Sequence, residues 1–342
     1  RSIRSVLVVS GGAMGSLFSG FLTAASLKSG GSFDVLLRAN WKEHREEIER
    51  NGLRVHPCSK ETETIWNQIE RDVGIAGNEK EAIVKVNAID DSIFDVNSSR
   101  HRVVDSVLLL EKSCYTEQCA HMIKNVLAAN GSCLTLQNGM GNVDILQRIL
   151  GENRVLQGST SQAAMINQPG SVEHTGIGYI KIATPSETVK PAATWWVKTL
   201  LSVGLAATPA GSDFERVLWE KLIINSAINP LTSLYGVKNG ELRNSEAMKS
   251  LMKDIVQEGV AVAKAIGVNL SVEDMYEKTL LVCTQTANNN SSMYSDILRK
   301  RSTEVDFING YIARTGEKQH VLVPINRCIT KMIKAKEDLI QQ

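Results

Sequence analysis

The sequence lacks the features that mark several large classes of protein. No run approaches the ~20 apolar residues that a membrane-spanning helix needs, so we expect no membrane segment. No block of lysine and arginine stands out and the formal net charge is +1, which argues against nucleic acid as a partner. Histidine, cysteine and aspartate form no cluster with metal-ligand spacing, so we expect no metal. Internal repeats and low-complexity tracts are also missing.

The cysteines form no Cys-x-x-Cys pair. There are six of them, and they are Cys58, Cys114, Cys119, Cys133, Cys283 and Cys328. They lie largely in apolar segments, so we interpret them as reduced core thiols, which fits a cytoplasmic protein. No secretory signal peptide is recognisable. Because the first residue is Arg1 rather than methionine, we expect a few natural residues to precede it.

The length of 342 residues suggests two domains, and the sequence pattern changes once. In the first part, short apolar runs alternate with helix-like stretches, as is typical of a parallel α/β sheet. The expected strands are 6–9, 33–37, 107–110 and 133–136, and the expected helices are 14–27, 117–129 and 192–203. Residues 57–103 interrupt this spacing, and we interpret them as an insertion on the domain surface.

From Phe214 onward helical periodicity dominates and strand signals almost vanish. The expected helices are 214–235, 245–266, 272–286, 296–316 and 326–340. The fold class is therefore α/β, with a Rossmann-like domain over 1–211 followed by an all-helical domain over 212–342.

The stretch VLVVSGGAMGSLFSG, residues 6–20, resembles the glycine-rich turn that holds a dinucleotide between a strand and a helix. Gly12 would let the backbone approach the pyrophosphate, and Gly15 would let the helix pack on the strand. Ser10 stands where the first glycine is usual, and Gly11 beside it is expected to absorb part of the strain. The alternative is an ordinary glycine-rich turn. We expect Ser10 to be tolerated and Gly11–Gly15, including Ala13 and Met14, to contact the cofactor.

Arg38 ends the second expected strand, in VLLRAN. An acidic residue there binds the ribose 2′-hydroxyl of NAD, whereas an arginine accommodates the 2′-phosphate of NADP. The sequence therefore favours NADPH, with a preference of about one to two orders of magnitude in affinity over NADH from one charge-assisted contact. The alternative is a solvated surface arginine.

Three polar side chains interrupt the apolar helix predicted over 214–235. Lys221, Asn225 and Asn229 follow the spacing i, i+4, i+8, which places them on one face. Such groups are costly to bury without partners, so we expect them to line a polar cleft. A solvated helix face is the alternative.

A second polar cluster lies in residues 287–310, with Asn289, Ser291, Ser292 and Glu304. Helix capping is the alternative role for one of its serines.

In these motifs the chain resembles the ketopantoate reductases. The segments that carry the resemblance are GGAMGS (11–16), LLR (36–38), LLLEKS (108–113), LQNGMGN (136–142), GSTSQAA (158–164), KLIINSAINPLTSLYGVKNGEL (221–242) and NNSSMYSDILRKRSTEVDFING (289–310). They cover nearly the whole chain except 57–103.

The resemblance implies hydride transfer from NADPH to 2-dehydropantoate, on the route to pantothenate and coenzyme A. By resemblance, Lys221 is the general acid and Glu304 binds the substrate hydroxyl. The substrate-binding residues it implies are Asn138, Asn225, Asn229, Asn239, Asn289 and Ser292. The cofactor contacts it implies beyond the glycine-rich turn are Arg38, Lys112, Asn138, Ala163 and Glu258. The expected partner is a small 2-keto acid, and a homodimer is the candidate assembly.

Three departures mark a divergent member: Ser10, the long segment 57–103, and Gln162 where many members have histidine. Two alternatives therefore stay open. One is a reductase of another branched 2-keto acid, and the other is a non-catalytic NADP(H)-binding protein.

Overall fold

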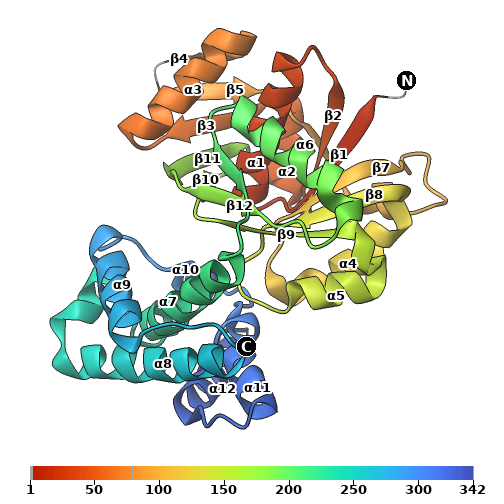
Figure 1. Cartoon of the computed structure of the whole chain (residues 1–342). Helices are drawn as coiled ribbons and strands as arrows, with labels where there is room; N and C mark the ends of the chain where they lie inside the picture. Colours follow the sequence, from red (N-terminus) through yellow and green to blue (C-terminus); the bar gives the residue numbers. More distant parts are fainter. Residues whose placement is uncertain (1–2, 79, 342) are drawn as a thin grey trace. The chain divides into compact units, whose positions relative to one another are not determined.

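The computed structural model describes residues 3–78 and 80–341, which form two compact units (Figure 1). Unit 1 runs to Gly211, and unit 2 starts at Ser212. Two short loops, Lys112–Cys114 and Asn138–Asn142, group with unit 2 although the strands before them belong to unit 1. This corrects the expectation that the whole of 1–211 forms one domain. The α/β class of the first part and the helical class of the second are confirmed.

Unit 1 is built on an eight-stranded sheet in the order β13-β12-β9-β8-β7-β1-β2-β6. Its strands are β1 (Arg4–Val9), β2 (Phe33–Arg38), β6 (Asn87–Ile89), β7 (Val104–Leu109), β8 (Leu127–Thr135), β9 (Val155–Thr160), β12 (Tyr179–Ile182) and β13 (Ala206–Pro209). The strands from β9 to β6 pair in parallel, whereas β12 runs antiparallel to β9. The carboxyl ends of the parallel strands therefore share one edge, which is where ligands bind in such sheets.

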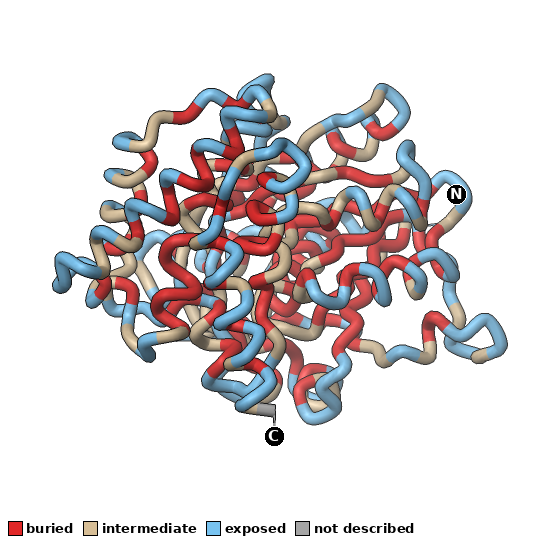
Figure 2. Tube along the Cα trace, turned by 90° about the horizontal axis from the view of Figure 1, so that it is seen from below, coloured by how far each residue is buried: buried red, intermediate tan, exposed pale blue. Residues whose placement is uncertain are grey.

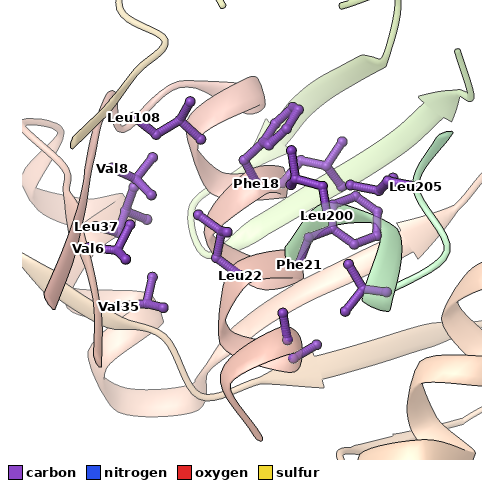
Figure 3. Close-up of a cluster of buried hydrophobic side chains, with 14 of the residues drawn as sticks. Val6, Val8, Phe18, Phe21, Leu22, Val35, Leu37, Leu108, Leu200 and Leu205 are labelled. Atoms are coloured by element: carbon purple, nitrogen blue, oxygen red, sulfur yellow. The ribbon is translucent and has the colours of Figure 1, made fainter. Parts of the chain in front are cut away.

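Helices cover both faces of this sheet, which explains why β1 is apolar from Val6 to Val9. The helices are α1 (Ala13–Lys28), α2 (Lys42–Asn51), α3 (Lys60–Val73), α4 (Thr116–Val126), α5 (Asn142–Leu150) and α6 (Lys190–Ser202). The 3₁₀ turns are η1 (Asp91–Phe94), η2 (Ser113–Tyr115), η3 (Glu152–Arg154) and η4 (Glu187–Val189). Val6 and Val8 share a core with Phe18 and Phe21 of α1 (Figure 3), while Leu7 lies in a second core with α4. β1 is buried from Ser5 to Val9. Figure 2 shows the buried residues of the whole trace in red and the exposed ones in pale blue.

Residues 57–103 are part of the fold, so the interpretation as a surface insertion is wrong. They supply β6 to the main sheet and two strands to a second sheet, in the order β10-β11-β3-β5-β4. Its strands are β10 (Ala163–Gln168), β11 (Ser171–Gly176), β3 (Leu53–Pro57), β5 (Glu81–Val84) and β4 (Ala76–Asn78). Trp66 of α3 is 1% exposed and stacks on Phe21 with ring centroids 4.6 Å apart. The three strands β4, β5 and β6 have only three or four residues each, which is too short for a clear alternating pattern in the sequence.

Two buried histidines join these layers. The Gly170 backbone N–H donates to Nδ1 of His44, and the Trp66 indole donates to Nδ1 of His174. In each ring Nε2 faces a side-chain oxygen, of Ser16 and of Gln162 respectively. Both rings are fully buried, and burial lowers the pKa of each histidine from 6.5 to about 4. Both are therefore neutral in the folded chain at neutral pH.

Stability is expected to fall as the pH drops from about 6.5 towards 4. In that window the unfolded chain binds protons at His44 and His174 and the folded chain does not, so protonation favours unfolding. The loss amounts to about 2 kcal/mol for each histidine at pH 5. Denaturant unfolding at pH 7.5 and pH 5 measures it. His174→Gln, which keeps an acceptor for Trp66, should lose less stability between the two pH values than the native chain. An identical loss would contradict the assignment.

Unit 2 is helical in its described residues from 212 onward. Its elements are α7 (Phe214–Tyr235), η5 (Asn239–Asn244), α8 (Glu246–Ala265), α9 (Val272–Gln285), α10 (Ser292–Leu298), η6 (Val305–Phe307), α11 (Asn309–Lys318) and α12 (Pro324–Gln341). The predicted helix over 296–316 is wrong, because the chain leaves the helix after Leu298 and Lys300 has φ 54°. In the described parts of the chain, no helix combines the length and apolarity needed to cross a membrane.

α7 continues through Pro230, which cannot donate to the carbonyl four residues before it. That carbonyl belongs to Ser226, and the Asn309 side chain donates to it at 3.0 Å. A buried amide from α11 thus satisfies the group that proline leaves without a backbone partner.

The cysteines only partly match the expectation of core thiols. All six are thiols, and Cys119, Cys133 and Cys283 are buried. The other three, Cys58, Cys114 and Cys328, are exposed. Their flanking sequences are more polar than we allowed for.

Candidate functional site

The glycine-rich turn of unit 1 has the close approaches that its sequence predicts. A Cβ on Gly15 would lie 1.8 Å from the backbone oxygen of Ser10, and one on Gly11 would lie 2.7 Å from Cα of Ala39. Gly12 is the N-cap of α1 and supplies no side-chain cap to its first turn. The N–H groups at this helix end, with the positive end of the helix dipole, fit a phosphate. The turn therefore fits the pyrophosphate of a dinucleotide.

Ser10 fits the turn without backbone strain. Its side chain is buried, and its hydroxyl accepts from the Gly12 N–H at 3.1 Å. Ser10 does not have the positive φ that would require glycine. The turn thus accommodates a serine at the position where glycine is usual, and the serine hydroxyl adds a local hydrogen bond to the turn.

Two of the expected cofactor contacts, Arg38 and Lys112, form ion pairs with acidic side chains of their own unit. Arg38 ends β2 as predicted, but it is 4% exposed and ion-paired with Asp91 and Glu111. Lys112 groups with unit 2 and pairs with Asp296 at 2.6 Å. Ala163 is exposed at the start of β10.

Glu258, an expected cofactor contact, has structural hydrogen bonds within unit 2. It is buried on α8, and its carboxylate accepts from the backbone N–H groups of Ile325 and Asn326, each at 2.8 Å. The Asn326 side chain donates to it as well, at 2.8 Å. These are groups of the first turn of α12, so Glu258 caps that helix. An acidic residue in an amphipathic helix gives no sign in the sequence of such a distant partner.

The polar stripe of α7 is not a solvated helix face. Lys221 and Asn225 are half-buried, and Asn229 is 6% exposed. The apolar residues between them, including Leu222 and Ile223, lie in the core of unit 2. Buried polar groups at this spacing are suited to binding a polar ligand.

Lys221 and Glu304 belong to a group of charged side chains that we call the lysine–carboxylate cluster, formed by Lys112, Lys221, Asp296 and Glu304. Burial lowers the pKa of Lys221 to about 8, while Glu304 acts in the opposite direction. Lys112 lies 2.6 Å from Asp296 and 3.8 Å from Glu304. Burial lowers the pKa of Lys112, but the two carboxylates outweigh it and raise that pKa overall. Burial raises the pKa of Asp296, with Lys112 opposing it.

The loop Asn138–Asn142 is attached to this cluster through Ser113. The Ser113 backbone N–H and hydroxyl donate to Oε1 of Glu304, at 3.1 and 3.0 Å. The same hydroxyl also donates to the backbone oxygen of Asn138, at 2.6 Å. The buried side-chain amide of Asn142 donates to the Ser113 hydroxyl oxygen and to the Asn138 backbone oxygen. Gly139 has φ 77°, and a Cβ there would lie 2.6 Å from the Phe307 oxygen. Asn138 is therefore held close to Glu304.

The remaining predicted residues of this region, and the cap Ser291, differ in burial and in hydrogen bonding. The Asn239 N–H donates to the Asn289 carbonyl at 3.0 Å, so these two predicted residues lie together. The side-chain oxygen of Asn239 is buried and has no hydrogen-bond partner among the described residues, so a donor could bind there. Ser291 caps α10 by accepting from the Tyr294 N–H at 3.0 Å. Ser292 is exposed beside it.

Sequence reasoning missed three members of this site: Asp296, Ser113 and Asn142. Each lies inside a segment that carried the resemblance, but none stood out by spacing or charge. Among the described residues, no group of histidine, cysteine, aspartate and glutamate could hold a metal ion.

Activity is expected to fall above about pH 8. Burial lowers the pKa of Lys221 to about 8, so its ammonium is lost progressively above that value. If the ammonium is the acid, kcat/KM should drop about tenfold per pH unit on the alkaline side. A pH profile of kcat/KM between pH 6 and 10 measures this. A profile that stays flat to pH 9.5 would exclude Lys221 as the titrating acid.

The family described as ketopantoate reductase PanE/ApbA matches residues 6–187, and its C-terminal counterpart matches residues 213–337. The chain belongs to the ketopantoate reductase family. The resemblance seen in the sequence is confirmed. The match to residues 6–187 includes the whole of 57–103, in agreement with the role of that segment in both sheets.

Two curated relatives share the name 2-dehydropantoate 2-reductase. A 2-dehydropantoate 2-reductase of Halobacterium salinarum is 28% identical over 334 residues, covering 96% of this chain and 97% of the relative. The 2-dehydropantoate 2-reductase of Pyrococcus horikoshii is 31% identical over 235 residues, covering 69% of this chain and 76% of the relative.

Among solved structures, D-mandelate dehydrogenase with NADH and anilino(oxo)acetate has a TM-score of 0.83 and 25% identity, covering 98% of this chain and 99% of the other. A ketopantoate reductase of Ralstonia eutropha has a TM-score of 0.80 and 27% sequence identity, and the match covers 99% of this chain and 100% of the other.

Proposed function

We propose that the chain reduces 2-dehydropantoate to pantoate with NADPH. The observation that carries the proposal is the half-buried Lys221 beside Glu304 within the family's C-terminal region. Reduction of a ketone builds negative charge on the carbonyl oxygen, which an ammonium stabilises and protonates. The names of the curated relatives support the substrate.

In this proposal each side of the substrate has a protein partner. Lys221 binds the keto oxygen and donates a proton from Nζ, and Glu304 accepts from the substrate hydroxyl. The other contacts are Asn138, Asn225, Asn229, Asn239, Asn289 and Ser292. The uncapped first turn of α1 would hold the dinucleotide phosphates, and a bound reduced nicotinamide would supply the hydride. The cytoplasmic location and the homodimer stay predictions.

The decisive experiment follows NADPH oxidation with three 2-keto acids. They are 2-dehydropantoate, 2-ketoisovalerate, which lacks the hydroxymethyl group, and phenylglyoxylate, the keto form of mandelate. We expect kcat/KM for 2-dehydropantoate to exceed the others at least about a hundredfold, because loss of the hydroxyl leaves a buried carboxylate without its ligand. A preference for phenylglyoxylate or 2-ketoisovalerate would favour another 2-keto acid. No turnover with any keto acid, despite cofactor binding, would favour the non-catalytic alternative.

A further inference from the structure

Arg38 meets two carboxylates at the end of β2. Its Nε lies 2.6 Å from Oδ1 of Asp91, and its Nη2 lies 3.0 Å from Oδ2. Its third nitrogen, Nη1, is 3.5 Å from Oε2 of Glu111. The positive charge on which the NADPH expectation rests is therefore more than neutralised by its neighbours.

The sheet topology explains how Asp91 reaches Arg38. β6 pairs in parallel with β2, with Ile89 opposite Arg38, and the Ala39 N–H donates to the Ile89 oxygen at 2.9 Å. Asp91 opens η1 two residues after β6, so it lies at the same carboxyl edge as Arg38. Its side chain is 53% exposed, whereas that of Arg38 is 4% exposed. The group at this edge that solvent reaches is thus the acid.

The Asp91 carboxylate binds the N–H groups of the Arg38 guanidinium that a phosphate would otherwise bind. Arginine binds carboxylates and phosphates through the same pair of N–H groups. An acid at this edge of a dinucleotide-binding sheet also suits the ribose 2′-hydroxyl of NADH. We propose that Asp91 competes with the ribose 2′-phosphate for Arg38 and thereby narrows the preference for NADPH over NADH. The proposal rests on the proposed function only in that a nicotinamide dinucleotide binds unit 1.

The size of the effect follows from the exposure of the pair. To bind a 2′-phosphate at Arg38, the ion pair with Asp91 must open and the freed carboxylate must stay near a dianion. The Asp91 side of this pair is 53% exposed, so water screens it, and like charges in water also contribute modestly. Together we expect these two effects to change the affinity about tenfold. The native chain should therefore prefer NADPH by less than about tenfold, below the one to two orders of magnitude that Arg38 alone suggests.

The test compares Asp91→Asn with Asp95→Asn. Asp95 is exposed just after η1 and its carboxylate accepts from the Asn97 N–H at 2.9 Å, whereas the ion-pair partners of Arg38 are Asp91 and Glu111. Its variant therefore removes the same charge from a carboxylate that is not one of these partners of Arg38. Dissociation constants of NADPH and NADH come from fluorescence titration without keto acid. Displacement by adenosine 2′,5′-bisphosphate and by adenosine 5′-monophosphate isolates the 2′-phosphate. Asp91→Ser provides a second variant, and thermal melting verifies folding.

Asp91→Asn is expected to increase the affinity for NADPH and for the bisphosphate about tenfold. The affinities for NADH and for the monophosphate should stay within about threefold of those of the native chain. In Asp95→Asn the ratio of the NADPH and NADH affinities should equal that of the native chain. An unchanged ratio in both Asp91 variants, or an equal shift in Asp95→Asn, would overturn the proposal while leaving the proposed reaction intact. Failure of both dinucleotides to bind the native chain would overturn the proposed function and this inference together.

Discussion

Replacing Lys221 with alanine is expected to lower kcat by about 10²–10⁴ while the NADPH dissociation constant stays within a few-fold. The ammonium interacts most strongly when charge develops on the carbonyl oxygen, so its loss affects the transition state more than the ground state. The cofactor's phosphates are expected at the first turn of α1, in the other unit of the chain.

The electrostatics of the lysine–carboxylate cluster make this effect specific to Lys221. Burial brings the pKa of Lys221 to about 8, close to working pH, so it can both hold and release a proton. The two carboxylates raise the pKa of Lys112, which keeps it charged and makes it a poor acid. Lys112 therefore cannot replace Lys221 as proton donor, although it lies 3.8 Å from Glu304.

Two further variants make the result decisive. Lys221→Arg keeps the charge but donates a proton reluctantly, because the pKa of arginine exceeds ~12, so it should recover little activity. Lys331→Ala removes an exposed lysine from α12 and should change neither turnover nor binding. Turnover of Lys221→Ala within a few-fold of native would place the acid elsewhere in the chain.

The parts of this fold that the sequence predicts are those set by local pattern. The apolar run of β1, the glycine-rich turn and the period of α7 each need only neighbouring residues to be recognised. The same holds for the stripe of Lys221, Asn225 and Asn229, which one helical period brings to one face.

The parts that the sequence does not predict depend on distant partners. Asp91 reaches Arg38 only because β6, a strand of three residues, pairs with β2. Glu258 caps α12 from 67 residues away along the chain. The break after Leu298 interrupts a stretch whose apolar period continues on both sides, so periodicity alone joined α10 to α11.

Replacing Gly15 with alanine is expected to destabilise unit 1 by about 3 kcal/mol or more. The added Cβ would lie 1.8 Å from the Ser10 backbone oxygen and 2.7 Å from its carbonyl carbon. Neither atom can rotate away as a side chain would, so α1 must move off β1. That movement separates Phe18 and Phe21 of α1 from Val6 and Val8 of the sheet (Figure 3), all of which are fully buried.

Thermal melting of Gly15→Ala measures this loss, with Gly12→Ala as the matched control. At Gly12 a Cβ would meet only the Ser10 hydroxyl, at 3.3 Å, and φ is −80°, so the fold should survive. We expect Gly15→Ala to lower Tm by about 6–12 °C, taking about 2–4 °C per kcal/mol for a unit of this size. Gly12→Ala should melt within about 2 °C of native yet bind NADPH more weakly, because its methyl group crowds the backbone that the pyrophosphate approaches. Equal melting of both variants and the native chain would show that α1 and β1 are not held at the spacing that Gly15 permits.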